Sequence, residues 1–183
     1  MAGRLGAVKV RLAAGVLVAL IVAFAAYWFF LRVDEVEPRV MVPKLAATIG
    51  EGEDAIGVSG NGTMVRWLPL PEDPPLPRLP LDEAPKGGRV RGPALEQVHV
   101  LAAVPDPLRP YTESSFFGES GVGVNLTTGI ELVFGDATRA HRKWRAVAAV
   151  LANPEITALD YVNVTAPNRP SFEGSEHELP PPP

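Results

Sequence analysis

The apolar run from Leu12 to Leu31 constrains this chain more than any other feature, because no charged residue interrupts it. An α-helix rises about 1.5 Å per residue, so a helix of this length spans roughly 30 Å, the thickness of the hydrocarbon core of a bilayer. A helix buried in a soluble domain seldom needs so long an unbroken apolar stretch. Residues 12–31 are therefore predicted to form a transmembrane helix.

Charges on the two flanks of the run predict its orientation. Residues 1–11 carry Lys and Arg without any acidic residue, whereas acidic residues follow the run closely. Because Lys and Arg are retained on the cytoplasmic side, residues 1–11 are expected in the cytoplasm and residues 32–183 outside the cell membrane. The alternative is a cleaved signal peptide, since "AFA" at 23–25 resembles a cleavage site, but the run is longer than the usual apolar core of such peptides.

Composition argues against several classes of function. The chain has no cysteine, which excludes disulfides, thiolate catalysis and cysteine-ligated metals. Its net charge of −4 argues against a nucleic-acid-binding protein, because such domains usually carry a marked basic excess. His99, His141 and His177 lie far apart in the sequence, with no metal-ligand spacing. We therefore predict no cofactor, no metal and no catalytic residue.

Residues 32–54 are expected to be a charged connector, followed by a folded domain over 55–174. The domain opens with a predicted β-hairpin at 55–68, in which Asn61-Gly62 forms a two-residue type I′ turn. The predicted cross-strand pairs are Val58 with Val65 and Ile56 with Trp67, all four on one buried face. Prolines restrict the next stretch, 69–85, to an extended surface connection whose leucines partly tuck against the domain.

The second half of the domain alternates helices and strands. A helix is predicted at 92–105 with Pro93 in its first turn, and strands are predicted between 109 and 135. A second helix is expected to start at an Asp136 N-cap and to bury one stripe. The residues of that stripe are Ala140, Trp144, Val147, Ala148 and Leu151. Further extended segments are predicted at 161–166 and 169–174, and residues 175–183 are expected to be a disordered, proline-rich tail. The expected fold class is α+β, with one mixed sheet and two helices.

The second helix carries the densest positive charge of the chain. The charged residues are Arg139, Arg142, Lys143 and Arg145. Such a cluster is typical of the solvated face of an amphipathic helix. The alternative is a docking surface for an acidic partner or for anionic lipid headgroups.

Catalytic motifs are weak. The sequence "GESG" at 118–121 lacks the G-x-S-x-G spacing of a nucleophile turn, and no His–Asp pair is placed beside it. Two classes of function remain open at this point. One is a membrane-tethered exported hydrolase or transferase, for which Ser120 and His141 are the residues to test, and the other is an envelope adhesion module.

One ordered set of segments resembles a known family. It consists of Thr128-Gly129 through Gly135, the basic helix with Lys143, the strand Val162-Asn163-Val164, and Pro167-Asn168-Arg169-Pro170. In this order the segments resemble the end of the β domain in the bacterial cell-division family FtsQ/DivIB, and the resemblance extends over roughly 55–174. The chain departs from that family at Asn163, which is usually aspartate, and in residues 32–54, which are too few for the family's POTRA domain.

The resemblance implies a non-catalytic scaffold of the septation machinery. Its implied partners are single-pass division proteins of the FtsB/DivIC and FtsL types, and the partner adds a strand to the last strand of the β domain. Pro167 and Pro170 lack amide donors, so their segment is expected at a sheet edge, where strand addition is physically reasonable. The predicted partner-binding residues are Tyr161, Val162, Val164, Arg169, Pro170, Ser171 and Phe172. The alternative is that the prolines and the charged tail only blunt this edge against aggregation.

Overall fold

Two β-sheets, one of them covered by helices, make up the part of the chain that a computed structural model describes, namely residues 42–81 and 83–181. The predicted cytoplasmic segment 1–11 and transmembrane helix 12–31 lie outside these residues. Within the described part, no helix is both long and apolar enough to cross a membrane. The residues from Pro43 onward form a single compact unit.

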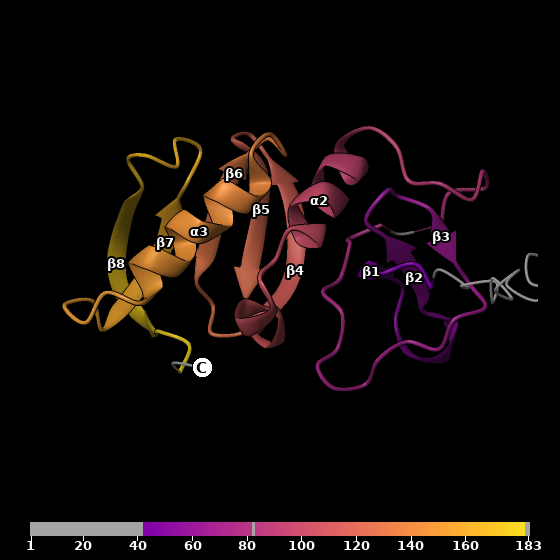
Figure 1. The fold of residues 1–183 in the computed structure, drawn as a ribbon, viewed down its shortest axis with the longest axis horizontal. Coiled ribbons are helices and arrows are strands. Elements are labelled where there is room, and N and C mark those ends of the chain that lie inside the picture. Colours follow the sequence, from indigo (N-terminus) through magenta and orange to yellow (C-terminus); the bar gives the residue numbers. More distant parts are fainter. Residues whose placement is uncertain (1–41, 82, 182–183) are drawn as a thin grey trace, which may run out of the picture. The chain divides into compact units, whose positions relative to one another are not determined.

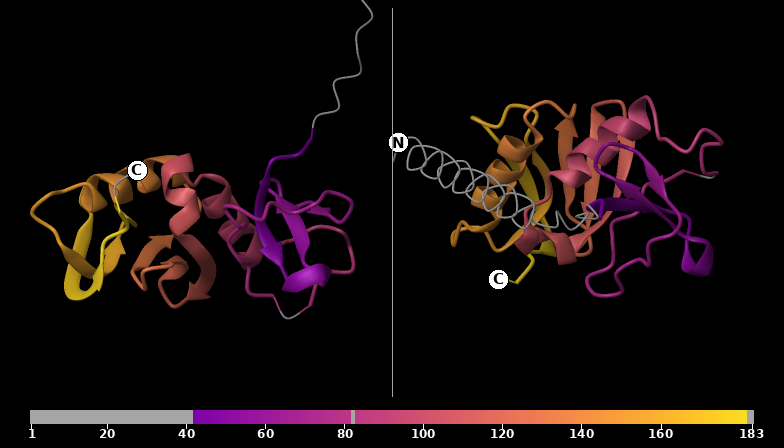
Figure 2. Two further views of the ribbon diagram at one scale, coloured as in Figure 1. Left: turned by 90° about the horizontal axis from the view of Figure 1, so that it is seen from below. Right: turned by 45° about the vertical axis from the view of Figure 1, so that its right-hand side comes forward.

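The five-stranded sheet has the order β4-β5-β6-β7-β8. Its strands are β4 (Thr112–Gly118), β5 (Gly121–Leu126), β6 (Glu131–Gly135), β7 (Ala158–Asn163) and β8 (Ser171–Glu178). Neighbours pair antiparallel except β6 and β7, which are parallel and are joined through helix α3 (Ala140–Leu151). Helices α2 (Pro93–Ala102) and α3 lie on one face of this sheet (Figures 1 and 2). The expected α+β fold class with a mixed sheet is thus confirmed, but the expectation of a single sheet is wrong, because β1, β2 and β3 form a second sheet.

Strand alternation separates a buried face from an uncovered face. Val124, Leu132 and Val162 are opposite one another across β5, β6 and β7, and all three are fully buried beneath the helices. Trp144 joins this core from α3: its ring centroid lies 4.9 Å from that of Phe134, and its indole nitrogen donates to the Val100 carbonyl of α2 at 2.8 Å. The predicted helix at 92–105 is confirmed as α2, with proline at its first turn.

The three-stranded sheet contains a strand that the sequence analysis missed. β1 (Leu45–Ile49) lies inside the predicted connector 32–54 and pairs with β2 (Ile56–Ser59), which pairs in turn with β3 (Met64–Val65). All five β1 residues are buried, so the strand lacks the polar–apolar alternation that marks a half-buried strand. The expected domain start at residue 55 is therefore too late, since the folded unit begins at Pro43.

The hairpin at 55–68 has a three-residue loop instead of the predicted type I′ turn. The Gly62 amide donates to the Ser59 carbonyl at 2.8 Å, and Gly62 has a φ of 81°. This is a type I turn followed by a glycine bulge. The Asn61 side-chain oxygen stabilises it, because it accepts from the Ser59 hydroxyl at 2.8 Å and from the Thr63 amide at 3.0 Å.

The longer loop shifts the hairpin register by one residue. Val58 pairs with Met64, whereas the two-residue turn predicted Val65 as its partner. Trp67 lies beyond the end of β3 and is 68 % exposed, so the predicted pair of Trp67 with Ile56 is wrong.

The proline-rich stretch 69–85 links the two sheets. Arg78 bridges to β1 on one side and to β4 on the other, and Leu79 is buried, as expected for a leucine that tucks against the domain. On the β4 side, the Arg78 amide donates to the Glu113 carbonyl at 2.8 Å and its carbonyl accepts from the Ser115 amide at 3.0 Å. A segment this rich in proline can lie between two strands because, among its described residues, only the backbone amides of residues 78 and 79 donate hydrogen bonds to those strands.

Three further boundaries differ from those predicted. β7 spans Ala158–Asn163, where an extended segment was predicted at 161–166. α3 begins at Ala140, with Arg139 at the N-cap in a left-handed conformation, so Asp136 is not the N-cap. β8 runs to Glu178, and residues 175–178 are therefore part of the sheet although they were assigned to the disordered tail. Every β8 residue except His177 is exposed, which explains why the strand resembles a tail in composition.

Candidate functional site: an open sheet edge and a basic hollow

β8 is the last strand of the five-stranded sheet and pairs only with β7 among the described residues. The expected edge position is thereby confirmed for Ser171 and Phe172 (Figure 1), whereas Arg169 and Pro170 lie in the loop before β8. The opposite edge strand, β4, is bridged through Ser114 to Arg78. An edge strand carries backbone amides and carbonyls that an added strand can pair with.

Phe172 ends an apolar row that runs across the sheet. Its cross-strand partner on β7 is Val162, which is in turn opposite Leu132 of β6. Val162 and Leu132 are fully buried, whereas Phe172 remains 44 % exposed because no strand lies beyond it among the described residues. A strand added alongside β8 would cover this ring and continue the row.

Some of the predicted partner-binding residues are buried in the core instead. Val162 and Val164 are 0 % exposed and cannot contact a partner without unfolding β7, so their assignment is wrong. Tyr161, 36 % exposed, lies on the other face of the sheet, where its hydroxyl donates to the Glu173 carboxylate at 3.3 Å. Arg169 and Pro170 precede β8, and Ser171 and Phe172 begin it, so these four remain candidates.

An irregular bulge interrupts the pairing of β8 with β7 in the middle of β8. Tyr161 pairs with Glu173 and Leu159 with His177, so three β8 residues stand opposite the single residue Asp160. The Asp160 carboxylate accepts from the Glu176 amide at 2.8 Å and thereby holds the bulge. The three histidines show no metal-ligand spacing in the sequence, yet the bulge brings ligand atoms of Asp160, Glu176 and His177 within 4.8 Å of one another.

Gly174 allows this bulge, and its replacement by alanine is expected to weaken the docking of β8. Gly174 has a φ of 107°, and an added Cβ would lie 2.1 Å from the Asp160 carboxyl carbon. We expect Gly174→Ala to lower the free energy of unfolding by about 1–3 kcal/mol, measured by urea denaturation of the full-length protein. Gly87→Ala is the control, because Gly87 has open space around it and no positive φ. Equal stability of the two variants would contradict this account of the bulge.

Lys143 does not belong to a surface cluster. Only 2 % of its side chain is exposed, and its ammonium donates to the Phe134 carbonyl at 2.9 Å, to the Asp136 carbonyl at 3.0 Å and to the Asp136 carboxylate at 2.5 Å. The hydrogen bond from Lys143 is the main reason that the pKa of Asp136 falls from 3.8 to about 2. Its assignment to a partner or lipid contact is therefore wrong, and its role is to tie α3 to the end of β6.

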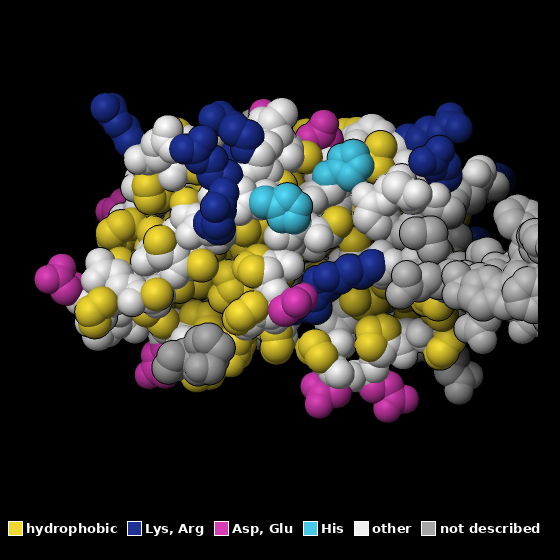
Figure 3. All heavy atoms as spheres, viewed as in Figure 1, with side chains coloured by type: hydrophobic (Ala, Val, Ile, Leu, Met, Phe, Trp, Pro, Cys, Tyr) yellow, Lys and Arg dark blue, Asp and Glu magenta, His cyan; other side chains and the backbone are white. Residues whose placement is uncertain are grey.

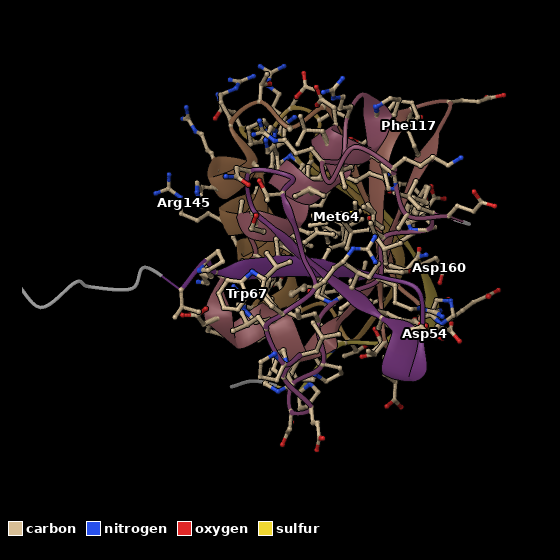
Figure 4. All side chains as sticks on the ribbon, turned by 90° about the vertical axis from the view of Figure 1, so that its right-hand side faces the viewer. Asp54, Met64, Trp67, Phe117, Arg145 and Asp160 are labelled. Atoms are coloured by element: carbon tan, nitrogen blue, oxygen red, sulfur yellow. The ribbon has the colours of Figure 1, made fainter. Side chains whose placement is uncertain are left out.

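Arg139, Arg142 and Arg145 remain at the surface and line a hollow of about 460 Å³ at the α2–α3 junction. His99 and His141 lie in the same lining. The space-filling view shows basic side chains gathered over the N-terminal part of α3, with two histidines beside them (Figure 3). Arg145 projects from the helical side of the molecule, whereas Asp160 lies on the sheet side (Figure 4).

A larger hollow of about 680 Å³ lies between the C-terminal end of α3 and the end of β8. Its lining is mainly apolar, with Leu108, Leu151, Ile156 and Leu179 among its residues. Ser120, the residue proposed for a hydrolase, is exposed in the turn between β4 and β5. His141, its proposed companion, lines the basic hollow.

Comparisons of the chain with protein-family models, with curated proteins and with solved structures found no match. Any assignment of function therefore rests on the residues and the geometry described above.

Proposed function

We propose that this protein is a membrane-anchored, non-catalytic scaffold of the FtsQ/DivIB type, which captures another division protein by strand addition along β8. Leu12–Leu31 would anchor it in the cell membrane, and the described domain would act outside the cytoplasm. Its proposed partners are single-pass proteins of the FtsB/DivIC and FtsL types, and its proposed biological role is in septation.

The half-exposed Phe172 at the end of a buried apolar row is the observation that carries this proposal. Isolated exposed aromatic residues are common and need no explanation, but Phe172 shares its face with Val162 and Leu132, which are fully buried. A partner strand that pairs with the β8 backbone would bring an apolar side chain against this ring. The backbone bonds would supply affinity, and the side chain would supply selectivity.

The charge of the edge indicates which strands it accepts. Glu173, Glu176 and Glu178 are all exposed along β8. Like charges directly opposite each other in a sheet are destabilising, so an antiparallel pairing of two copies of β8 is disfavoured. A strand with Lys or Arg at alternating positions would be favoured, which agrees with a different protein as the partner.

The decisive experiment is capture of the partner by the Phe172→Glu variant. The full-length chain and the FtsB/DivIC-type protein of the same cell would be co-expressed, and the recovered complex would be quantified. Loss of an aromatic contact and introduction of a further carboxylate at the edge are each expected to cost about 1–3 kcal/mol, so capture should fall at least about tenfold.

Phe117→Glu is the matched control. Phe117 lies on β4, the edge strand at the other side of the sheet, and is 52 % exposed, close to the 44 % of Phe172. We expect the control to capture the partner at the wild-type level and both variants to remain folded. Undiminished capture by Phe172→Glu would exclude strand addition at β8 and favour the alternative in which this edge is only blunted against aggregation.

A separate experiment tests the division role. A fluorescent fusion of the full-length protein is expected at the division site, and depletion of the protein is expected to give filamentous cells. A uniform membrane distribution with normal septation would refute the division role, whatever the outcome of the capture experiment.

A further inference from the structure

The basic hollow at the α2–α3 junction is independent of the β8 edge. Among the described residues, none of the three guanidinium groups that line it, those of Arg139, Arg142 and Arg145, forms an ion pair. Lys143, the other cation of this helix region, is neutralised by Asp136. A carboxylate does lie at the margin of the hollow, because Glu96 of α2 accepts from the amide of Ala137, a lining residue, at 2.9 Å. It forms no ion pair with the three arginines, so the hollow keeps a net positive charge although the chain as a whole has a net charge of −4.

The backbone of Arg139 supports a role for its side chain. Arg139 has a φ of 55°, and it is the one non-glycine residue with a positive φ in the described part of the chain. This conformation costs a residue with a Cβ about 1 kcal/mol, and glycine adopts it without that cost. An arginine here therefore places a charged side chain at the hollow against the local backbone preference, as occurs where a functional contact requires it.

The shape of the hollow favours a projecting ligand. Small residues form much of its lining, namely Gly60, Ala102, Ala103, Ala137 and Ala140. Arg142 and Arg145 are three residues apart on α3, so their side chains lie on one side of the helix. Arg139, at the N-cap of the same helix, lines the hollow with them. A flat membrane surface would meet the protruding guanidinium groups but would not fill the space between them. Carboxylate side chains projecting from a protein segment can enter it and form bidentate bonds with arginine.

We propose that this hollow is a second docking site, which binds an acidic segment of a partner protein through Arg139, Arg142 and Arg145. It differs from the β8 edge in charge and in mode of recognition. The edge is acidic and offers backbone pairing, whereas the hollow is basic and offers side-chain pairing. Two partners, or two separate segments of one partner, can thus be bound at once.

Binding of a synthetic peptide rich in Asp and Glu to the full-length protein in a non-ionic detergent tests this proposal. The same peptide with Asn and Gln in place of the acids is the control ligand. We expect the acidic peptide to bind at low salt and the control peptide not to bind. Arg142→Ala combined with Arg145→Ala should weaken binding at least about tenfold, because charge-assisted hydrogen bonds contribute about 1.5–3 kcal/mol each.

The Arg139→Gly variant distinguishes a loss of binding charge from a loss of folding stability. It removes the guanidinium group and also removes the cost of the left-handed backbone, so we expect weaker peptide binding with no loss of thermal stability. Arg66→Ala is the matched control, since Arg66 is exposed but does not line the hollow, and it should bind as the wild type does.

Three results would overturn the proposal. The first is equal binding of the acidic peptide by the wild type and the double arginine variant. The second is binding of phosphatidylglycerol vesicles, lost in that variant, without any binding of the peptide, which would assign the hollow to lipid headgroups. The third is displacement of the bound acidic peptide by inorganic phosphate at the same concentration at which unlabelled peptide displaces it, which would indicate a site for a small anion.

Discussion

Trp144→Ala is expected to lower the free energy of unfolding by about 3–5 kcal/mol, the largest effect of any single truncation proposed for this protein. Trp144 is 1 % exposed, so its replacement leaves a cavity where α2, α3 and the sheet meet. The change also removes the 2.8 Å hydrogen bond from the indole nitrogen to the Val100 carbonyl, which leaves a buried carbonyl without that donor. Urea denaturation of the full-length protein, followed by circular dichroism, measures the loss.

Two control variants divide this effect into its parts. Trp144→Phe keeps an aromatic ring against Phe134 but loses the hydrogen bond to α2, and we expect a smaller loss of about 1–3 kcal/mol. Trp67→Ala removes a tryptophan that is 68 % exposed, and its effect should stay within about 0.5 kcal/mol. A Trp144→Ala variant as stable as Trp67→Ala would mean that the helices do not pack on the sheet as described.

The parts of the fold that sequence patterns predict well are those with one buried and one exposed side. The strand residues Val122, Val124 and Leu126 alternate with smaller or polar neighbours, and they are buried in β5 as predicted. The α3 stripe is confirmed for Ala140, Trp144 and Val147, which are buried. Ala148 and Leu151 are only partly buried, because the C-terminal end of α3 borders the apolar hollow.

The parts that were missed depend on contacts that alternation does not encode. β1 is buried on both sides and β8 is almost entirely exposed, so neither shows a period of two. The hairpin register depends on Asn61, whose side chain favours a three-residue loop over the common two-residue turn.

For the candidate sites, the positions of Pro167 and Pro170 were enough to infer a sheet edge. They were not enough to infer which neighbouring residues are exposed there and which are buried. Val162 and Val164 differ from Phe172 only in their distance from the margin of the sheet, which the sequence does not show. Lys143 was grouped with the arginines because it lies among them in the sequence. On the helix, however, its side chain points to the end of β6, where it donates to the Phe134 carbonyl and the Asp136 carboxylate. An acidic residue seven positions earlier in the sequence is a signal that could have revealed this role.

Lys143→Met is expected to lower the free energy of unfolding by about 2–4 kcal/mol, because it leaves the Phe134 and Asp136 carbonyls without the ammonium donor. Methionine retains most of the apolar stem, so the loss reports the ammonium group rather than a cavity. Arg145→Met, a change at an exposed position of the same helix, should alter stability by no more than about 0.5 kcal/mol.

The pH dependence of stability provides an independent measure of the same ion pair. The folded-state pKa of Asp136 is lowered from 3.8 to about 2, so its contribution to stability is present above about pH 4 and is lost as the pH falls from about 4 to about 2. Asp136→Asn should remove this contribution, with a loss near neutral pH of about 1–2 kcal/mol. That is less than the pKa shift alone implies, because the carboxylate is 59 % exposed and solvent screens it. Below about pH 2 the wild type and the variant should converge in stability. A constant difference between them across the whole range would show that the Asp136 carboxylate does not pair with Lys143 as a charged group.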